Sequence, residues 1–272
     1  MRAAVSFRTV RIIVLLAVLA IVAGVTYWES WSVRQWSRPL TVRIYPVNGD
    51  ASIAVQRYVA GLTPAQFQEI GFFLSQESKR YRLQPLQAPK IILEAAISAL
   101  PPAPPTQVRN IPAVLLWSLQ LRYYEFRNTQ FWQDLGQIKL FVVYHEGKQG
   151  VPLESSLGLR KGLFGIVHAF AQIRQNAQNN VVITHELLHT LGATDEYDAN
   201  LMPLFPDGYG DPEASPLFPQ TQAEIMAGRI AISPSRAIIP DNLGACVIGP
   251  KTAYQIHWAN AETPAGRRGV SC

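Results

Sequence analysis

The sequence predicts one domain of the α+β class over residues 41–272, and three observations support this prediction. Short apolar segments bounded by Pro, Gly and Asn are typical of strands. Two other segments have helical signals, one beginning at Thr63 and one at Val181. In addition, 48% of the residues are apolar and 16% are charged, so the chain can fill a core and does not have the composition of a disordered protein.

The first element is an uncharged apolar run, Ile12–Trp28. At about 1.5 Å per residue a helix of this length spans roughly 25 Å, enough for a thin bilayer or for the apolar part of a signal peptide. Arginines precede the run, Tyr27 and Trp28 end it, and Glu29 follows it without a clear A-x-A cleavage site. The pattern predicts that residues 1–28 are an uncleaved anchor that places the rest of the chain outside the cytoplasm, periplasmic or extracellular. A cleaved signal segment is the alternative.

Charge supports the same interpretation. The net charge of +5 is not concentrated in a long basic run, which argues against a nucleic-acid partner and agrees better with an anionic membrane nearby.

A linker at 29–40 is followed by an alternating segment, residues 40–49, which predicts a strand that ends in a turn at Pro and Asn-Gly. A helix is expected to begin at Thr63, because Thr63 can act as N-cap, Pro64 suits the first helical position and Gln66 completes a capping box.

Further apolar runs predict additional strands. They cover residues 89–95, 111–124, 138–146 and 163–172. Prolines at 100–107 form a stiff connection. After Asp198 the chain is rich in Pro and Gly and is expected to form loops.

The segment VVITHELLHTLGATDEYD, residues 181–198, contains the candidate chemistry. His185 and His189 are four residues apart, so on a helix they share one face and both imidazoles can reach one ion. Neutral imidazole is a good zinc ligand at about 2.0–2.1 Å. Glu186 lies about 100° round the helix from His185, close enough to a water on the ion to act as a base without binding the ion.

The residues after the second histidine complete the pattern. Gly192 can end the helix, because glycine accepts the left-handed conformation past a helix end. Asp195 then offers a carboxylate oxygen, a competent zinc ligand at about 2.0–2.2 Å. Three protein ligands leave a fourth position open for water, as a catalytic zinc site requires.

The sequence HELLHTLGATDEY resembles the zinc-binding sequence of the metzincin metallopeptidases, HExxHxxGxxH, with Asp195 in place of the third histidine. The snapalysin family of small bacterial metzincins has the same HExxHxxGxxD pattern. The resemblance covers residues 185–195. It implies Zn²⁺ as cofactor, with His185, His189 and Asp195 as ligands and Glu186 as general base.

With this resemblance we expect a zincin-like architecture: a twisted, mainly parallel sheet with one antiparallel edge strand, packed on the zinc-binding helix and on the helix that begins near residue 63. A loop-rich C-terminal subdomain would lie below the substrate cleft. Residues 165–171 resemble the edge strand that lines this cleft in the matrix metallopeptidase branch and would pair with an extended peptide. An ordinary core strand with a structural His168 is the alternative.

Metzincins also have a methionine turn beneath the metal. Met226 is preferred here, because Ile-Met followed by a small residue looks more like the family turn. Met202 remains the alternative, since its spacing from Asp195 is similar to that of the matrix branch. Either methionine could instead simply fill the core.

Other acidic residues are alternatives for the third ligand. Glu196 and Asp198 could replace the motif aspartate or hold a ligand imidazole from outside. Glu213 or Glu224 could serve in a thermolysin-like arrangement, which would leave the motif glycine without a role.

Several other polar residues are expected to be structural. Asp207 and Asp211 suggest a calcium loop but do not complete a ligand set, which favours a turn. His145 and His257 are isolated in the sequence and are interpreted as surface or structural residues, and Tyr254 as a transition-state donor has no positional support.

The two cysteines, Cys246 and Cys272, are predicted to form a disulfide in an exported protein, with free thiols as the alternative. Neither precedes the zinc-binding helix, so no thiol latency switch is expected.

Together these features predict a membrane-anchored or exported zinc endopeptidase that acts on protein or peptide substrates. Glu186 would act as general base on a zinc-bound water. The charge of Asp195 should make this water slightly less acidic than three neutral ligands would, so we expect optimal activity at neutral to mildly alkaline pH. The alternatives are a membrane-tethered binding module with a structural or degenerate zinc site, and a zinc hydrolase of a non-peptide bond.

Overall fold

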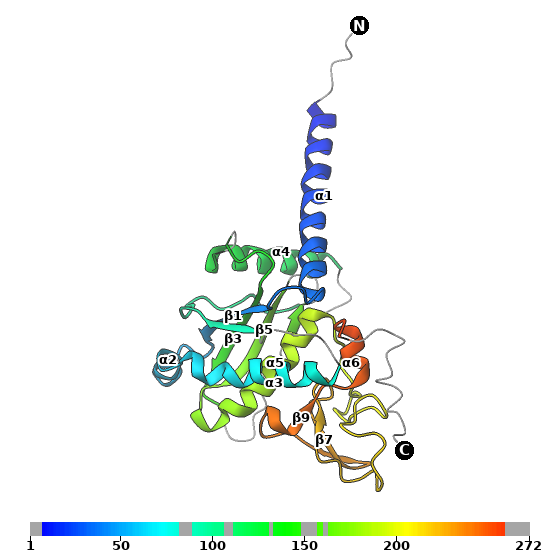
Figure 1. The fold of residues 1–272 in the computed structure, drawn as a ribbon. Coiled ribbons are helices and arrows are strands. Elements are labelled where there is room, and N and C mark those ends of the chain that lie inside the picture. The colour runs from blue at the N-terminus through cyan, green and yellow to red at the C-terminus, as the bar shows by residue number, and fades with distance from the viewer. Residues whose placement is uncertain are drawn as a thin grey trace.

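The computed structural model describes residues 7–81, 89–105, 111–130, 133–147, 157–159 and 163–258. Within these ranges the side chains are described except at residues 18, 19, 21–23, 26, 30 and 157–159. The described part is a sheet with helices on both faces, from which one long helix rises (Figure 1). It includes every residue of the histidine motif.

The sheet has five strands, four of them parallel. In spatial order they are β2 (Lys90–Leu93), β1 (Thr41–Asn48), β3 (Ile138–His145), β5 (Phe164–Phe170) and β4 (Leu157–Leu159). The first four run parallel, and β4 pairs antiparallel with β5 at the edge. The predicted α+β class with a mainly parallel sheet and an antiparallel edge strand is confirmed at this level.

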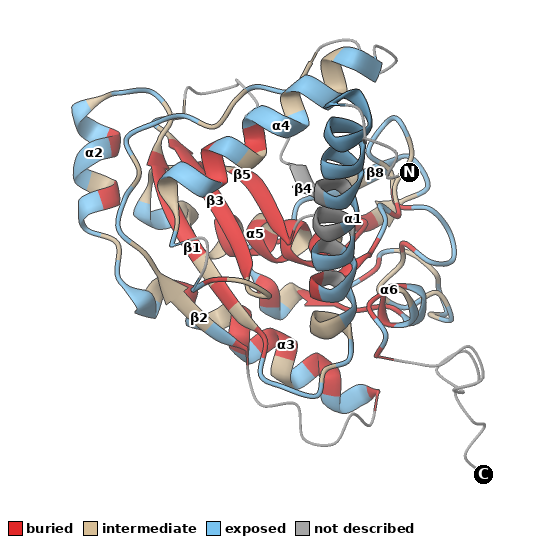
Figure 2. Ribbon diagram, turned by 90° about the horizontal axis from the view of Figure 1, so that it is seen from above, coloured by how far each residue is buried: buried red, intermediate tan, exposed pale blue. Residues whose placement is uncertain are grey.

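Alternate side chains of the strands enter two cores on opposite faces of the sheet. Ile44 packs in the core that includes α3 (Gln68–Arg80) and α5 (Asn176–Leu191). Val47 packs in the core that includes α4 (Ile111–Asn128). Both faces of the central strands are therefore buried (Figure 2).

The helical segment predicted at Thr63 is present. It follows α2 (Ile53–Ala60) and begins with a short 3-10 turn, η1 (Pro64–Phe67), which leads directly into α3. The backbone N–H of Thr63 donates to Gln66 Oε1 at 2.5 Å, one half of the predicted capping box. This confirms the capping signals.

The strand predicted at 111–124 is wrong, because these residues form α4. Trp117, Leu121 and Tyr124 have helical spacing and face the sheet. Apolar residues also occupy the face of α4 that points away from the sheet. They hide the helical repeat of about 3.6 residues in the sequence. The run is also longer than most strands, and Pro112 is compatible with the first turn of a helix.

Residues 165–170 belong to β5, which pairs with β3 along its length, and β4 pairs with β5 only at residues 164–166. The predicted edge strand is therefore covered by β4 over its first residues, and β4 is the outermost strand of the described sheet. The three residues of β4 carry little periodicity for a sequence pattern to detect.

The long helix α1 spans Phe7–Arg34 and therefore continues into the predicted linker. Its C-terminal end is fixed to the domain, because the Glu29 carboxylate accepts a hydrogen bond from the Gly136 N–H at 3.0 Å. Just beyond the helix, the Trp36 indole N–H donates to the Ile256 carbonyl at 2.7 Å. Within the described residues, no helix reaches the combined length and apolarity of a membrane span.

The C-terminal part has long loops around short elements. These are β6 (Ala223–Glu224), β7 (Ile230–Ser233), β8 (Arg236–Ile238), η3 (Leu243–Ala245), β9 (Cys246–Val247) and α6 (Pro250–Gln255). β6 pairs with β9, and β7 forms a hairpin with β8.

Burial raises the pKa of the Cys246 thiol to about 12. Cys272 lies outside the described residues, so the predicted disulfide does too.

Candidate metal centre

Helix α5 carries the two motif histidines and ends where the sequence predicts. Gly192 adopts φ 114° in the left-handed region and donates its N–H to the carbonyls of His189 at 3.0 Å and Leu188 at 3.1 Å. The Ala193 N–H also bonds to Leu188 O, at 3.0 Å. A side chain at residue 192 would strain this conformation, so glycine allows the chain to turn back under the histidines.

This turn brings three candidate ligand atoms together. Asp195 Oδ1 lies 3.2 Å from His185 Nε2 and 3.1 Å from His189 Nε2. The two Nε2 atoms are 3.0 Å apart, and the ring planes are nearly perpendicular at 86°. Among the described residues, these three side chains form the one group of potential metal ligands whose ligand atoms all lie within 4.8 Å of one another.

The opposite nitrogens of both rings fix the tautomer. His185 Nδ1 lies 2.9 Å from the Ile225 carbonyl, and His189 Nδ1 lies 2.9 Å from the Ala193 carbonyl. A carbonyl oxygen only accepts, so each Nδ1 is the donor and each Nε2 presents a lone pair to the shared point. Metal-binding histidines are commonly oriented by such a bond.

The donor set fits a small cation. When both imidazoles are neutral, their two Nε2 lone pairs and one carboxylate oxygen face each other, and they repel unless a metal cation or a proton on one Nε2 lies between them. Tetrahedral zinc with bonds of about 2.0–2.1 Å places neighbouring ligand atoms about 3.3 Å apart, close to the observed distances. The Asp195 side chain is 43% exposed, so the site is open to solvent on this side.

The charges of the site act on one another. Burial alone would lower the pKa of His189, but the hydrogen bond to Asp195 and the charge of Glu186 outweigh burial and raise this pKa. Burial would raise the pKa of Asp195, but its hydrogen bonds to both histidines hold it well below its ordinary value. The carboxylate is therefore ionised over the physiological pH range.

Glu186 is 5% exposed and follows directly after the first histidine on α5. Its negative charge acts on His189 and on Tyr197, which places the carboxylate beside the three-ligand cluster. This position is compatible with proton transfer to or from a group at the cluster.

A buried turn supports the cluster from below. Met226 is fully buried in it, and the preceding residue, Ile225, supplies the carbonyl that orients His185. The Met226 carbonyl accepts from the Glu196 N–H at 3.1 Å, which connects the turn to the ligand loop. Met202 is partly exposed and pairs instead with Asp198, whose Oδ1 accepts from its N–H at 2.9 Å. Met226, not Met202, thus lies in the turn that contacts a motif histidine.

Glu224 organises this turn. Its Oε2 accepts from the N–H groups of Met226 at 2.6 Å and Ala227 at 3.1 Å. Its Oε1 accepts from the Gly249 N–H at 3.0 Å and the Thr252 hydroxyl at 2.7 Å. Burial nevertheless raises the pKa of Glu224 to about 7.

Tyr197 belongs to the site, although the sequence did not single it out. Its ring stacks on His185 with centroids 6.4 Å apart and planes 24° apart. Burial and the negative charge of Asp195 raise its pKa to about 12. The signal was its spacing, because in an extended segment the residue two positions after a ligand lies on the same side of the chain.

The other acidic candidates lie outside the cluster. Glu196 is 1% exposed and pairs with Lys251 at 2.8 Å. Asp207 also pairs with Lys251, at 3.2 Å. Asp198 caps a turn through the Asn200 N–H at 2.8 Å.

Two more acidic candidates occupy a loop. The Asp211 carboxylate accepts from the Glu213 N–H at 3.2 Å, and the Glu213 side chain is exposed. His257 and Tyr254 are exposed as well.

His145 is not isolated, in contrast to the sequence interpretation. Its Nε2 lies 2.9 Å from His168 Nδ1, and its Nδ1 lies 2.7 Å from Asp50 Oδ1. The two rings are nearly coplanar, at 20°, with centroids 5.2 Å apart, which is the geometry of one N–H···N hydrogen bond. This chain of hydrogen bonds ties the ends of β3 and β5 to the turn after β1.

Comparison with known proteins gives no match, either to a protein-family model or to a curated sequence. The fold and the site together define an α+β protein with a candidate three-ligand metal centre on a helix of its sheet.

Proposed function

We propose that this chain is a zinc-dependent endopeptidase of the metzincin type, held at a membrane by its N-terminal helix. The observation that carries the proposal is the convergence of His185 Nε2, His189 Nε2 and Asp195 Oδ1 on one point, with Glu186 beside it. The mainly parallel sheet, its antiparallel edge strand and the buried Met226 turn support the zincin-like architecture.

Zinc held by the three ligands would supply a water of lowered pKa and would polarise the scissile carbonyl. Glu186 would act as the general base and would pass a proton to the leaving amine. The Ile225 carbonyl holds the His185 ring from one side, and the Tyr197 ring stacks on it. Asp195 adds one negative charge to the centre, which supports a neutral to mildly alkaline optimum.

The anchor proposal is supported by the apolar run and its flanking arginines, and by the position of α1. The exposed residues Ile13, Leu15 and Leu16 lie on the part of α1 that extends away from the domain (Figure 1). The catalytic domain would then be outside the cytoplasm, with the N-terminus inside.

The test compares cleavage of an unfolded protein, such as reduced casein, by the detergent-solubilised full-length chain and two variants. Glu186→Ala should retain zinc and lose turnover by several powers of ten, because it removes the base and leaves the ligands intact. Glu213→Ala removes an exposed carboxylate and should be as active as the wild type. Hydrolysis that persists in Glu186→Ala would contradict the assignment of the base. A chain that binds zinc but cleaves neither protein nor peptide would favour a structural site or a non-peptide substrate.

A further inference from the structure

Helix α4 exposes large apolar side chains on the side that faces away from the sheet. Leu115, Leu119 and Tyr123 are 61%, 68% and 65% exposed and follow one another at four-residue spacing. Ile111 and Leu116 extend the same surface. A soluble protein rarely leaves such a contiguous apolar surface in water, so the outward face of α4 marks an interaction site.

The charged side chains that α4 exposes are basic. The single acidic residue of α4, Glu125, is 1% exposed and turns inward, where it pairs with Lys139 at 2.8 Å and with Arg122 at 3.1 Å. Arg127 is exposed in the last turn of the helix. The outward face of α4 therefore carries apolar and basic groups and no carboxylate, which suits an anionic surface.

The direction of α1 identifies what this surface meets. Figure 1 shows α4 lying across the face of the domain from which α1 rises, and Figure 2 shows the same two helices from above. The end of α1 is tied to the domain through Glu29 and through Trp36 in the segment that follows. A bilayer that contains α1 therefore approaches the domain from the side of α4.

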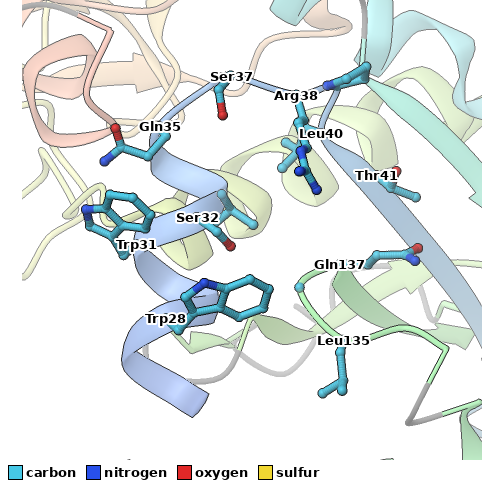
Figure 3. A pocket seen from close by; sticks show the side chains of 13 residues that line it. Trp28, Trp31, Ser32, Gln35, Ser37, Arg38, Leu40, Thr41, Leu135 and Gln137 are labelled. Atoms are coloured by element: carbon cyan, nitrogen blue, oxygen red, sulfur yellow. The ribbon is translucent and has the colours of Figure 1, made fainter. Parts of the chain in front are cut away.

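Aromatic and basic side chains gather at the foot of α1. Trp28 and Trp31 are 57% and 52% exposed and line a cavity of about 550 Å³ together with Arg38, Leu135 and Gln137 (Figure 3). Exposed tryptophans and a nearby arginine are typical of groups at the level of lipid headgroups. They mark the expected membrane surface at this end of α1.

We propose that α4 is a second membrane contact, which lies in the interface of an anionic bilayer with its outward face among the lipids. This rests on the proposed anchor, because α1 sets the side from which the bilayer approaches. The bilayer surface then covers the leucines of α4 and fixes the orientation of the domain. The candidate metal centre belongs to α5 on the opposite face of the sheet, so it faces the aqueous compartment and takes substrates from there.

The test places an environment-sensitive fluorophore at one position at a time in the full-length chain, reconstituted in vesicles of phosphatidylcholine and phosphatidylglycerol. Leu119→Cys reports on α4, Leu16→Cys on the anchor, and Phe72→Cys on α3 as a matched control that is 65% exposed on the other face of the sheet. Cys272→Ser provides the background, because the remaining thiol of Cys246 is buried and has a raised pKa.

The label at residue 119 should be quenched by spin-labelled lipid and should show several-fold weaker quenching by aqueous iodide than the label at residue 72. If the label at 119 is as accessible to iodide as the label at 72, α4 is not at the membrane and the proposal is wrong. Protection from iodide without quenching by spin-labelled lipid would show instead that a second copy covers α4, which also overturns it. The label at residue 16 tests the anchor separately. Quenching by spin-labelled lipid at residue 16 but not at residue 119 would contradict the α4 contact and leave the anchor supported, whereas no lipid quenching at residue 16 would contradict the anchor.

Discussion

The buried carboxyl group of Glu224 gives a quantitative test of how the turn under the metal centre is held. Four donors bond to this carboxyl group, which favours its ionised form, but its complete burial favours the protonated form and raises the pKa from 4.5 to about 7. In the folded state the proton is therefore held more tightly than in the unfolded state. The rise corresponds to about 3 kcal/mol of unfolding free energy, at about 1.4 kcal/mol per pH unit.

The sign follows from the direction of this pKa change. Below pH 4.5 the carboxyl is protonated in both states, so its contribution to stability is fully present. As the pH rises from 4.5 to about 7 the unfolded state releases its proton first, and this contribution is lost; above pH 7 the stability no longer changes with pH through Glu224.

The assay is urea unfolding of the detergent-solubilised chain with EDTA between pH 4.5 and 8, compared with Glu224→Gln and with the exposed control Glu213→Gln. The glutamine side chain does not titrate, so Glu224→Gln should lack about 3 kcal/mol of the decrease that the wild type and the control show over this range. Any hydrogen bonds lost in the variant add only a constant offset. Parallel curves for the wild type and Glu224→Gln would refute the reasoning and show that the four donors keep the carboxylate ionised throughout.

Three further predictions concern single side chains of α5 and the ligand loop. Gly192→Ala should destabilise the chain by about 1–2 kcal/mol in chemical denaturation, because an L-residue is strained at φ 114°; an unchanged midpoint would contradict the conformation. Tyr197→Phe keeps the ring on His185 and removes the hydroxyl, whose pKa is raised by the nearby Asp195 charge, so zinc affinity measured by competition with a chelating dye should fall about tenfold. Equal affinity would leave the Tyr197 hydroxyl without a positioning role. Leu187→Ala empties a fully buried position and should cost about 2–5 kcal/mol; a loss below 1 kcal/mol would mean that the core around α5 collapses to fill the space.

The sequence was most informative where local geometry decides the structure. Spacing on a helix placed His185 and His189 on one face, and the freedom of glycine at positive φ ended α5 at Gly192. Both inferences depend on the nearest few residues. The assignment of Asp195 came from the resemblance to the HExxHxxGxxD pattern, and its Oδ1 does lie 3.2 Å and 3.1 Å from the Nε2 atoms of the two histidines.

The sequence pattern failed at α4, where the apolar residues that face the sheet could not be distinguished from the apolar residues that face away from it. The apolar residues of α4 surround the helix, so the period that separates helix from strand is hidden, and residues 111–124 were predicted to be a strand. The same helix is now the basis of the proposed membrane contact. A sequence pattern alone does not show which apolar residues of such a helix are exposed.

Contacts between distant segments were not predictable from residue patterns. Tyr197 stacks on His185 in the candidate metal centre, and the neighbouring Glu196 N–H donates to the Met226 carbonyl, a contact made across the fold. His145 and His168 meet because β3 and β5 are paired in a register that places their ends together. Such juxtapositions depend on topology, which no short spacing encodes.

The central claim is that two imidazoles and one carboxylate hold a divalent cation, and metal content measures this most directly. The purified full-length chain, dialysed against zinc-free buffer and analysed by mass spectrometry, should carry about one equivalent of zinc, as expected for a site with three protein ligands. His185→Ala should carry almost none, whereas His145→Ala, which disrupts the other close histidine pair, should retain the full amount. A wild type without zinc, or equal zinc in the wild type and His185→Ala, would contradict the account.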